Sequence, residues 1–142
     1  MTRSTQPFSA RFDRRLLERL DASARAAGRS RSSLAERYVE EGMRMDEHPG
    51  IVFRDGPAGR RAGLVAGPDV WEVMIIVKNA PEAGDRAVAH AAEWLDLTPD
   101  QVLRAVGYYS GFPEEIEERI KRNREFGEAA EAAWRRQNEA LG

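Results

Sequence analysis

The amino-acid sequence predicts a mainly α-helical protein made of two small domains and a tail. Three observations lead to this fold class: a short alternating segment near the N-terminus, apolar residues at helical spacing behind capping residues, and glycines and a proline between two short apolar runs. With 142 residues the chain is long enough for one ordinary domain or two small ones. We place the domains at residues 1–47 and 48–124, and the tail at residues 125–142.

The N-terminal segment has the alternation of a half-exposed strand. Phe8, Ala10 and Phe12 fall on one side, and Ser9 and Arg11 fall on the other. A single strand leaves its backbone donors and acceptors unpaired, so we expect two copies of the chain to pair antiparallel, with the phenylalanines turned into the helices. The chain is therefore predicted to be a homodimer held by a two-stranded ribbon, an element that fits the DNA major groove.

Two helices follow this segment. Asp13 is a suitable N-cap for the first helix, Gly28 ends it, and Ser30 is a suitable N-cap for the second. Neither helix can bury its apolar stripe within so short a domain, which again favours a dimer. The apolar residues at helical spacing are Leu16, Leu17, Leu20, Ala24 and Ala27 in the first helix and Leu34, Tyr38, Val39 and Met43 in the second.

The run ARFDRRLLERLDASARAAGRSRSSLAERYVEEG, with its strand, cap, apolar stripe and Gly28-Arg29-Ser30-Arg31-Ser32 turn in this order, resembles the ribbon-helix-helix family of bacterial repressors. The resemblance implies that the outward strand residues Ser9 and Arg11 contact DNA bases. It also implies a phosphate at the start of the second helix, where backbone N–H groups and the helix dipole favour an anion. Pro7 stands where the family usually has a polar base reader, and proline has no N–H to donate. The expected phosphate contacts are Arg3, Arg14, Arg29, Arg31 and Ser32.

The charge distribution is strongly asymmetric although the net charge of the whole chain is only −2. Residues 1–37 hold nine arginines and four acids, whereas residues 38–113 hold seven basic and twelve acidic groups. A basic N-terminal domain followed by an acidic remainder is typical of a DNA-binding end joined to a protein-binding end, because only the first must approach phosphates.

The second domain begins after the proline and glycine that end the second helix. Ile51–Arg54 and Arg61–Val65 are predicted to form a hairpin across the turn at residues 55–59. Val70–Val77 is predicted as a buried helix behind Asp69, although its β-branched residues leave a strand as the rival interpretation. Further helices are expected over Asp85–Leu95, from the Thr98-to-Gln101 capping box onward, and from Pro113 to about Arg124.

The stretch HPGIVFRDGPAGRRAGLVAGPDVWEVMIIV, followed by LDLTPDQVLRAVGYYSGFPEEIEERIKRN, resembles a small helix-turn-helix family of unassigned function. Members of that family are commonly antitoxins encoded beside PIN-like ribonuclease toxins, so the resemblance implies a toxin protein as partner. The tail has few large apolar residues, and we expect it to be partly disordered alone. It could fold on the toxin with Trp134 as anchor and with Arg135 and Arg136 in contact with the carboxylates of the nuclease.

The combined hypothesis is an antitoxin and transcriptional autorepressor that binds a palindromic operator in double-stranded DNA as a dimer and neutralises a PIN-like ribonuclease. The alternative is a ribbon-helix-helix repressor whose second domain senses a small ligand in a pocket lined by Trp71, Tyr108 and Tyr109. A third interpretation makes the second domain another DNA reader, with phosphate contacts from Arg54, Arg60 and Arg61, although residues 38–113 are net acidic.

Catalysis is not expected. The chain has no cysteine, and its two histidines, His48 and His90, are far apart and show no metal-ligand spacing, so we expect no catalytic residue, no metal and no cofactor. No run approaches the roughly 20 apolar residues of a membrane-spanning helix, and no apolar signal peptide is recognisable. We therefore expect a cytoplasmic protein that does not contact a membrane.

Overall fold

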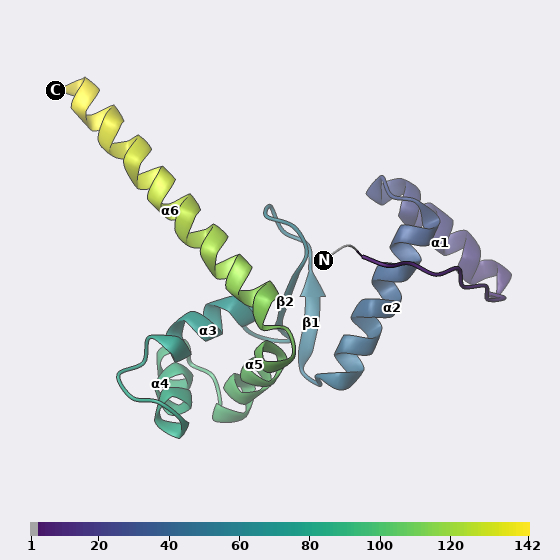
Figure 1. Ribbon diagram of the computed structural model, residues 1–142, viewed down its shortest axis with the longest axis horizontal. Helices are drawn as coiled ribbons and strands as arrows, with labels where there is room; N and C mark the ends of the chain where they lie inside the picture. The colour runs from purple at the N-terminus through teal and green to yellow at the C-terminus, as the bar shows by residue number, and fades with distance from the viewer. Residues whose placement is uncertain (1–2) are drawn as a thin grey trace. The chain divides into compact units, whose positions relative to one another are not determined.

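The computed structural model describes residues 3–142 and is mainly helical (Figure 1). Within this range the chain forms six helices and one two-stranded antiparallel sheet, as the predicted fold class requires at this coarse level. The chain divides into two compact units, Met1–Met43 and Arg44–Gly142, which are described separately. The elements are α1 (Arg14–Ala27), α2 (Arg31–Glu47), β1 (Ile51–Arg54), β2 (Arg61–Leu64), α3 (Val70–Lys78), α4 (Asp85–Leu95), α5 (Pro99–Gly111) and α6 (Pro113–Leu141).

The helix ends of the first unit lie where the capping residues predict them. Asp13 Oδ2 accepts hydrogen bonds from the backbone N–H groups of Arg15, at 3.0 Å, and Leu16, at 3.3 Å. Gly28 ends α1 in the left-handed conformation, with φ of 63°, which glycine adopts without steric cost. Ser30 Oγ accepts from the N–H of Ser33 at 3.1 Å and so caps α2.

The first unit has a very small core. Its buried apolar residues are Leu20, Ala24 and Leu34, and Leu17 and Ala35 pack against them. The rest of the predicted apolar stripe is exposed on the single chain. The large exposed members on α1 and α2 are Leu16 (47% exposed), Tyr38 (47%), Val39 (60%) and Met43 (56%).

The N-terminal segment is not a strand in the single chain. Residues 3–13 have no regular secondary structure, and Phe8 and Phe12 are exposed rather than packed on the helices. The strand is expected to form only by pairing with a second copy, so for this segment the antiparallel ribbon with inward phenylalanines stays a prediction. The physical reason is that a strand exists only through hydrogen bonds to a neighbouring strand, and the two strands of the described chain pair with each other.

The compact units divide inside α2, slightly before the boundary expected after residue 47. Arg44 explains why the end of this helix belongs to the second unit. Its Nη1 lies 2.8 Å from the hydroxyl of Tyr108 on α5 and 2.9 Å from Oε1 of Glu115 on α6. Its guanidinium carbon also lies 3.8 Å from the ring centre of Phe112, a cation–π distance.

The second unit packs a hairpin and four helices around one core. The β1 and β2 strands pair antiparallel, with Ile51 opposite Leu64 and Arg54 opposite Arg61, which confirms the predicted hairpin. Val70–Lys78 is a helix, so the helical interpretation of this segment is confirmed. Helix α3 contacts β2 and the other three helices of the unit, which explains why its residues are apolar on nearly every side. The largest fully buried side chains of this core are Tyr108, Leu64, Val70, Val73 and Val102.

A buried carboxylate ties the hairpin to α3. Asp69 is 8% exposed, and its Oδ2 lies 2.5 Å from Nε of Arg61, while its Oδ1 lies 3.8 Å from Nη1 of Arg54. Trp71 also donates its indole N–H to Oδ2 at 3.2 Å. A Cβ atom at Gly63 would lie 3.1 Å from Oδ1 of Asp69, so the absence of a side chain there allows this close approach. Asp69 thus joins three side chains that are separated in sequence.

We expect Asp69→Ala to lower the free energy of unfolding of the second unit by about 2 kcal/mol, because it removes the carboxylate paired with Arg61 and Arg54 and the acceptor of the Trp71 indole N–H. The effect stays below that of a fully buried pair, since about a third of each arginine side chain is in contact with solvent. Urea denaturation followed by tryptophan fluorescence measures it. Asp100→Ala, which removes an exposed pair with Arg104, is the control and should cost less than about 1 kcal/mol. Equal effects of the two substitutions would contradict the role given to Asp69.

Helix α6 is longer than the sequence suggested. It begins at Pro113, as predicted, but continues past Arg124 to Leu141, so the expectation of a partly disordered tail is wrong for this structure. The alanine- and glutamate-rich composition favours helix, and the pair Glu131–Arg135 adds support at the i, i+4 spacing. Ile116 anchors the first half in the core, while the second half projects from the other helices of the unit (Figure 1).

Candidate nucleic-acid and partner interfaces

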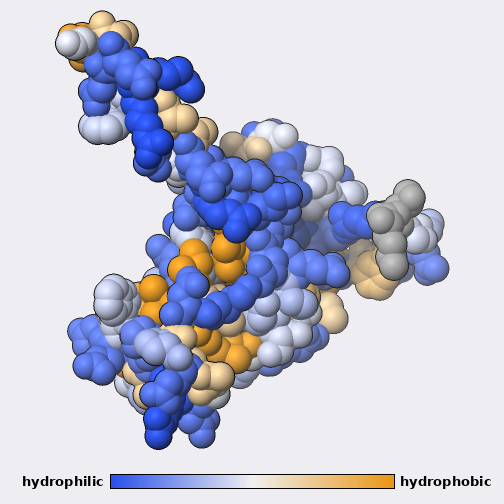
Figure 2. Space-filling view, turned by 60° about the vertical axis from the view of Figure 1, so that its left-hand side comes forward, coloured by the Kyte–Doolittle hydropathy of each residue, from blue (hydrophilic) through white to orange (hydrophobic). Residues whose placement is uncertain are grey.

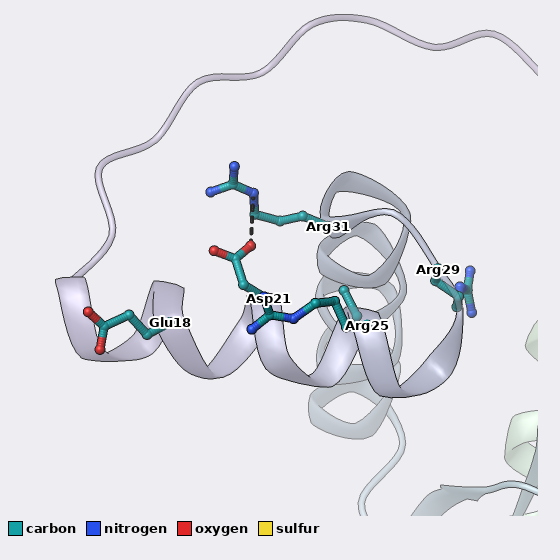
Figure 3. A pocket seen from close by; sticks show the side chains of 6 residues that line it. Glu18, Asp21, Arg25, Arg29 and Arg31 are labelled. Carbon is teal, nitrogen blue, oxygen red and sulfur yellow. Dashed lines mark ion pairs between the residues drawn. The ribbon is translucent and has the colours of Figure 1, made fainter.

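Three arginines surround the turn between α1 and α2. They line a hollow of about 310 Å³, which Figure 3 shows from close by. Arg25 comes from the last turn of α1, Arg29 from the turn, and Arg31 from the first residue of α2. The residues that line the hollow are Glu18, Asp21, Ala24, Arg25, Arg29 and Arg31. Three cations against two carboxylates give this hollow a net positive charge.

The start of α2 adds backbone donors to this positive surface. The first N–H groups of a helix have no acceptor within the helix, and the helix dipole places partial positive charge at this end. Ser30 Oγ accepts a hydrogen bond from the backbone N–H of Ser33. The backbone N–H groups of Arg31 and Ser32 are the other donors in this first turn. Arg29 donates from Nη2 to the Ser33 hydroxyl at 2.8 Å, which holds its guanidinium beside the same turn. The geometry suits a phosphate group.

The structure brings together only some of the predicted phosphate contacts. Arg29 and Arg31 line the same hollow, and Ser32 is exposed in the first turn of α2. Arg14 lies instead at the start of α1, with its Nε 3.4 Å from Oε1 of Glu18, and Arg3 forms an ion pair with Glu36. Both pairs are exposed and hence weak, so they do not prevent a phosphate contact.

Arg25 and Asp21 also line this hollow, although the sequence did not predict them as site residues. Glu18, Asp21 and Arg25 follow one another at intervals of three and four residues, the spacing that places side chains on one face of a helix. This spacing is the signal that could have found them. The two expected base contacts, Ser9 and Arg11, are exposed on the irregular N-terminal segment, and their role stays a prediction.

The projecting half of α6 has an apolar stripe that becomes visible only because the helix is continuous. Phe126, Trp134 and Leu141 are 78%, 63% and 87% exposed. Phe126, Ala130, Trp134 and Leu141 follow one another at intervals of four, four and seven residues and so share one side of the helix. Figure 2 shows that hydrophilic residues cover most of another side of this projecting helix. The tail is therefore an amphipathic helix with an exposed apolar face.

Trp134, Arg135 and Arg136 do not form one patch on this helix. Each residue advances about 100° around the axis, so Arg135 and Arg136 lie about 100° and 200° from Trp134. Arg135 also donates from Nη2 to Glu131 Oε1 at 2.6 Å on the polar side. Trp134 belongs to the apolar stripe, whereas the two arginines lie outside it.

The aromatic residues of the suggested ligand pocket serve the core instead. The Tyr108 side chain is fully buried, its hydroxyl donates to Glu115 Oε2 at 2.6 Å, and burial together with this bond raises the pKa of Tyr108. The Tyr109 hydroxyl donates to Glu117 Oε1 at 2.5 Å, and the Trp71 indole donates to Asp69. All three polar atoms already have protein partners, which weighs against a ligand site there.

The arginines of the hairpin are likewise engaged within the second unit. Arg54 and Arg61 face Asp69, and Nη1 of Arg60 lies 3.3 Å from Oδ2 of Asp55. Arg104 on α5 is also paired, with its Nε 2.8 Å from Oδ2 of Asp100. Because carboxylates of the protein pair with all four arginines, the second unit gives little support to a second DNA-reading element.

Further observations concern metal sites, membrane-spanning helices and similar proteins. Among residues 3–142 no three His, Asp or Glu side chains are grouped so that they could hold a metal ion. Over the same residues no helix has both the length and the apolar composition needed to cross a membrane. Comparisons with protein-family models, with curated proteins and with solved structures find no match to this chain.

Proposed function

We propose that this protein is a cytoplasmic antitoxin and autorepressor. In this proposal two copies of the first unit bind a palindromic operator, and the second unit with α6 binds and neutralises a PIN-like ribonuclease. The single observation that carries the DNA-binding role is the group of Arg25, Arg29 and Arg31 around the start of α2. Cations and helix amides at one turn are a recurring way of binding the DNA backbone.

The exposed apolar face of the first unit supports the homodimer. Leu16, Tyr38, Val39 and Met43 are large apolar side chains at about half or more of their full exposure. A second copy would cover them and, by pairing the N-terminal segments, would turn Phe8 and Phe12 inward and leave Ser9 and Arg11 facing the major groove. The proposed dimer thus accounts for the exposed phenylalanines and for the small core of the unit.

The apolar stripe of α6 supports the partner-binding role. Exposed aromatic residues on a projecting helix are the kind of anchors that fill pockets on a protein partner. We assign Trp134 and Phe126 as these anchors. They replace the set predicted from the sequence, which combined Trp134 with Arg135 and Arg136. The partner is expected to present an apolar groove with a polar rim.

The test is co-expression of the full chain with the product of the neighbouring gene, followed by purification through a tag on this chain. We expect a stoichiometric complex, and we expect the purified chain alone to retard a duplex taken from its own promoter. A complex without DNA binding would remove the repressor role. DNA binding without a complex would remove the antitoxin role.

Trp134→Ala is expected to weaken the complex at least about thirtyfold, because it removes the largest side chain of the stripe. Arg135→Ala is the matched control on the next residue and should change the dissociation constant by less than about threefold, since its guanidinium is paired on the polar side. Titration calorimetry with the purified partner measures both. If Arg135→Ala had the larger effect, the polar face and not the stripe would be the binding surface.

A further inference from the structure

The hollow at the α1–α2 turn contains an ion pair inside the proposed DNA-binding surface. Nε of Arg31 lies 3.3 Å from Oδ1 of Asp21, and Figure 3 shows the two side chains pointing toward one another. Arg29 points away from this pair in the same view. Arg31 is therefore a cation of the hollow that is paired, through its Nε, with a carboxylate of the protein itself.

We propose that the Asp21 carboxylate is an intramolecular competitor of DNA phosphate, which holds Arg31 in the free protein and releases it when the DNA backbone arrives. This inference rests on the proposed DNA-binding function and adds a residue that sets its strength. A carboxylate and a phosphate offer the same kind of oxygen pair to a guanidinium, so the two compete for one donor set. Binding to DNA then includes the exchange of one ion pair for another.

The exposure of the pair makes this exchange easy. The side chains of Arg31 and Asp21 are 53% and 42% exposed, and ion pairs at such exposure contribute little to folding. Breaking the pair should therefore leave α1 and α2 in place. Duplex DNA presents many phosphates along one surface and attracts Arg31 together with the neighbouring arginines, whereas a single weak anion must displace Asp21 without this help. Asp21 consequently lowers the affinity of the free protein for scattered anions.

A double-mutant cycle on the full chain separates this specific competition from a general charge effect. The probe is a fluorescent duplex from the promoter of the gene itself, at fixed salt. Asp21→Asn is expected to raise affinity about threefold to fivefold per subunit, and Arg31→Ala is expected to abolish this gain. Glu18→Gln is the charge-matched control, because Glu18 lines the same hollow but pairs with Arg14, so its effect should be equal with and without Arg31.

Each outcome decides the inference. A gain from Asp21→Asn that depends on Arg31, with thermal unfolding unchanged, supports it. A gain of equal size in the Arg31→Ala background would show that Asp21 acts only through net charge and would overturn it, as would no gain at all. If the wild type binds DNA but the effects of Asp21→Asn and Arg31→Ala are additive, this inference alone is overturned. If the wild type does not bind DNA at low salt, the proposed repressor function is overturned as well.

Discussion

Raising the salt concentration from ~50 to ~200 mM is expected to lower the affinity of the proposed dimer for duplex DNA about a thousandfold. Each phosphate neutralised by Lys or Arg releases condensed counterions, and about six contacts per dimer give a loss of this size. This number agrees with the three arginines around the α1–α2 turn, Arg25, Arg29 and Arg31, which each copy would bring to the proposed dimer. Fluorescence anisotropy across a salt series measures the slope, and a flat slope would count heavily against DNA binding through this surface.

Two variants separate positioning from base recognition in the same assay. Arg29→Ala should weaken binding to every duplex by a similar factor and reduce the salt slope, because it removes one proposed phosphate contact from each copy of the chain. Arg11→Ala should remove the preference for the operator over unrelated DNA, with a loss of about 1–3 kcal/mol per contact. Both variants should remain folded dimers, since both side chains are exposed. Loss of the dimer in Arg11→Ala would mean that this side chain faces the helices.

Leu34→Ala is expected to unfold the first unit while the second stays intact. Leu34 is fully buried in a core whose other buried apolar residues, within residues 3–43, are Leu20 and Ala24, and removing such a leucine typically costs about 2–5 kcal/mol. A unit with so few buried side chains has no comparable reserve of stability. Operator binding should be lost with the unit.

The positions of the tryptophans make this prediction easy to measure. Trp71, Trp94 and Trp134 all belong to the second unit, so their fluorescence reports its folding alone, whereas far-ultraviolet circular dichroism reports helix content in both units. We expect Leu34→Ala to reduce the helical signal at ambient temperature and to leave the tryptophan transition unchanged. Leu103→Ala, at a half-exposed position on α5, is the control and should change neither signal. A shifted tryptophan transition in Leu34→Ala would show that the two units unfold together.

The sequence alone determined where most helices begin and end. Asp13, Gly28 and Ser30 form the caps of α1 and α2 as predicted, and Thr98 and Gln101 form the capping box of α5, with Thr98 N–H donating to Gln101 Oε1 at 2.9 Å. The hairpin and the mainly helical fold class were also predicted. These features depend on hydrogen bonds between residues two to four positions apart or on short turns. The local sequence is therefore enough to predict them.

Only the tertiary structure decided which distant side chains meet. Asp69 could be read as a helix cap, but its pairing with Arg54 and Arg61 depends on how the hairpin packs on α3. In the same way, the meeting of Asp21 with Arg31 depends on how α2 returns across α1. The alternation of the N-terminal segment predicts a strand, but a strand forms only beside a neighbouring strand, so local sequence alone does not determine its structure. Local sequence determines backbone conformation through nearby hydrogen bonds, whereas contacts between separate elements depend on the burial of apolar surface throughout each unit.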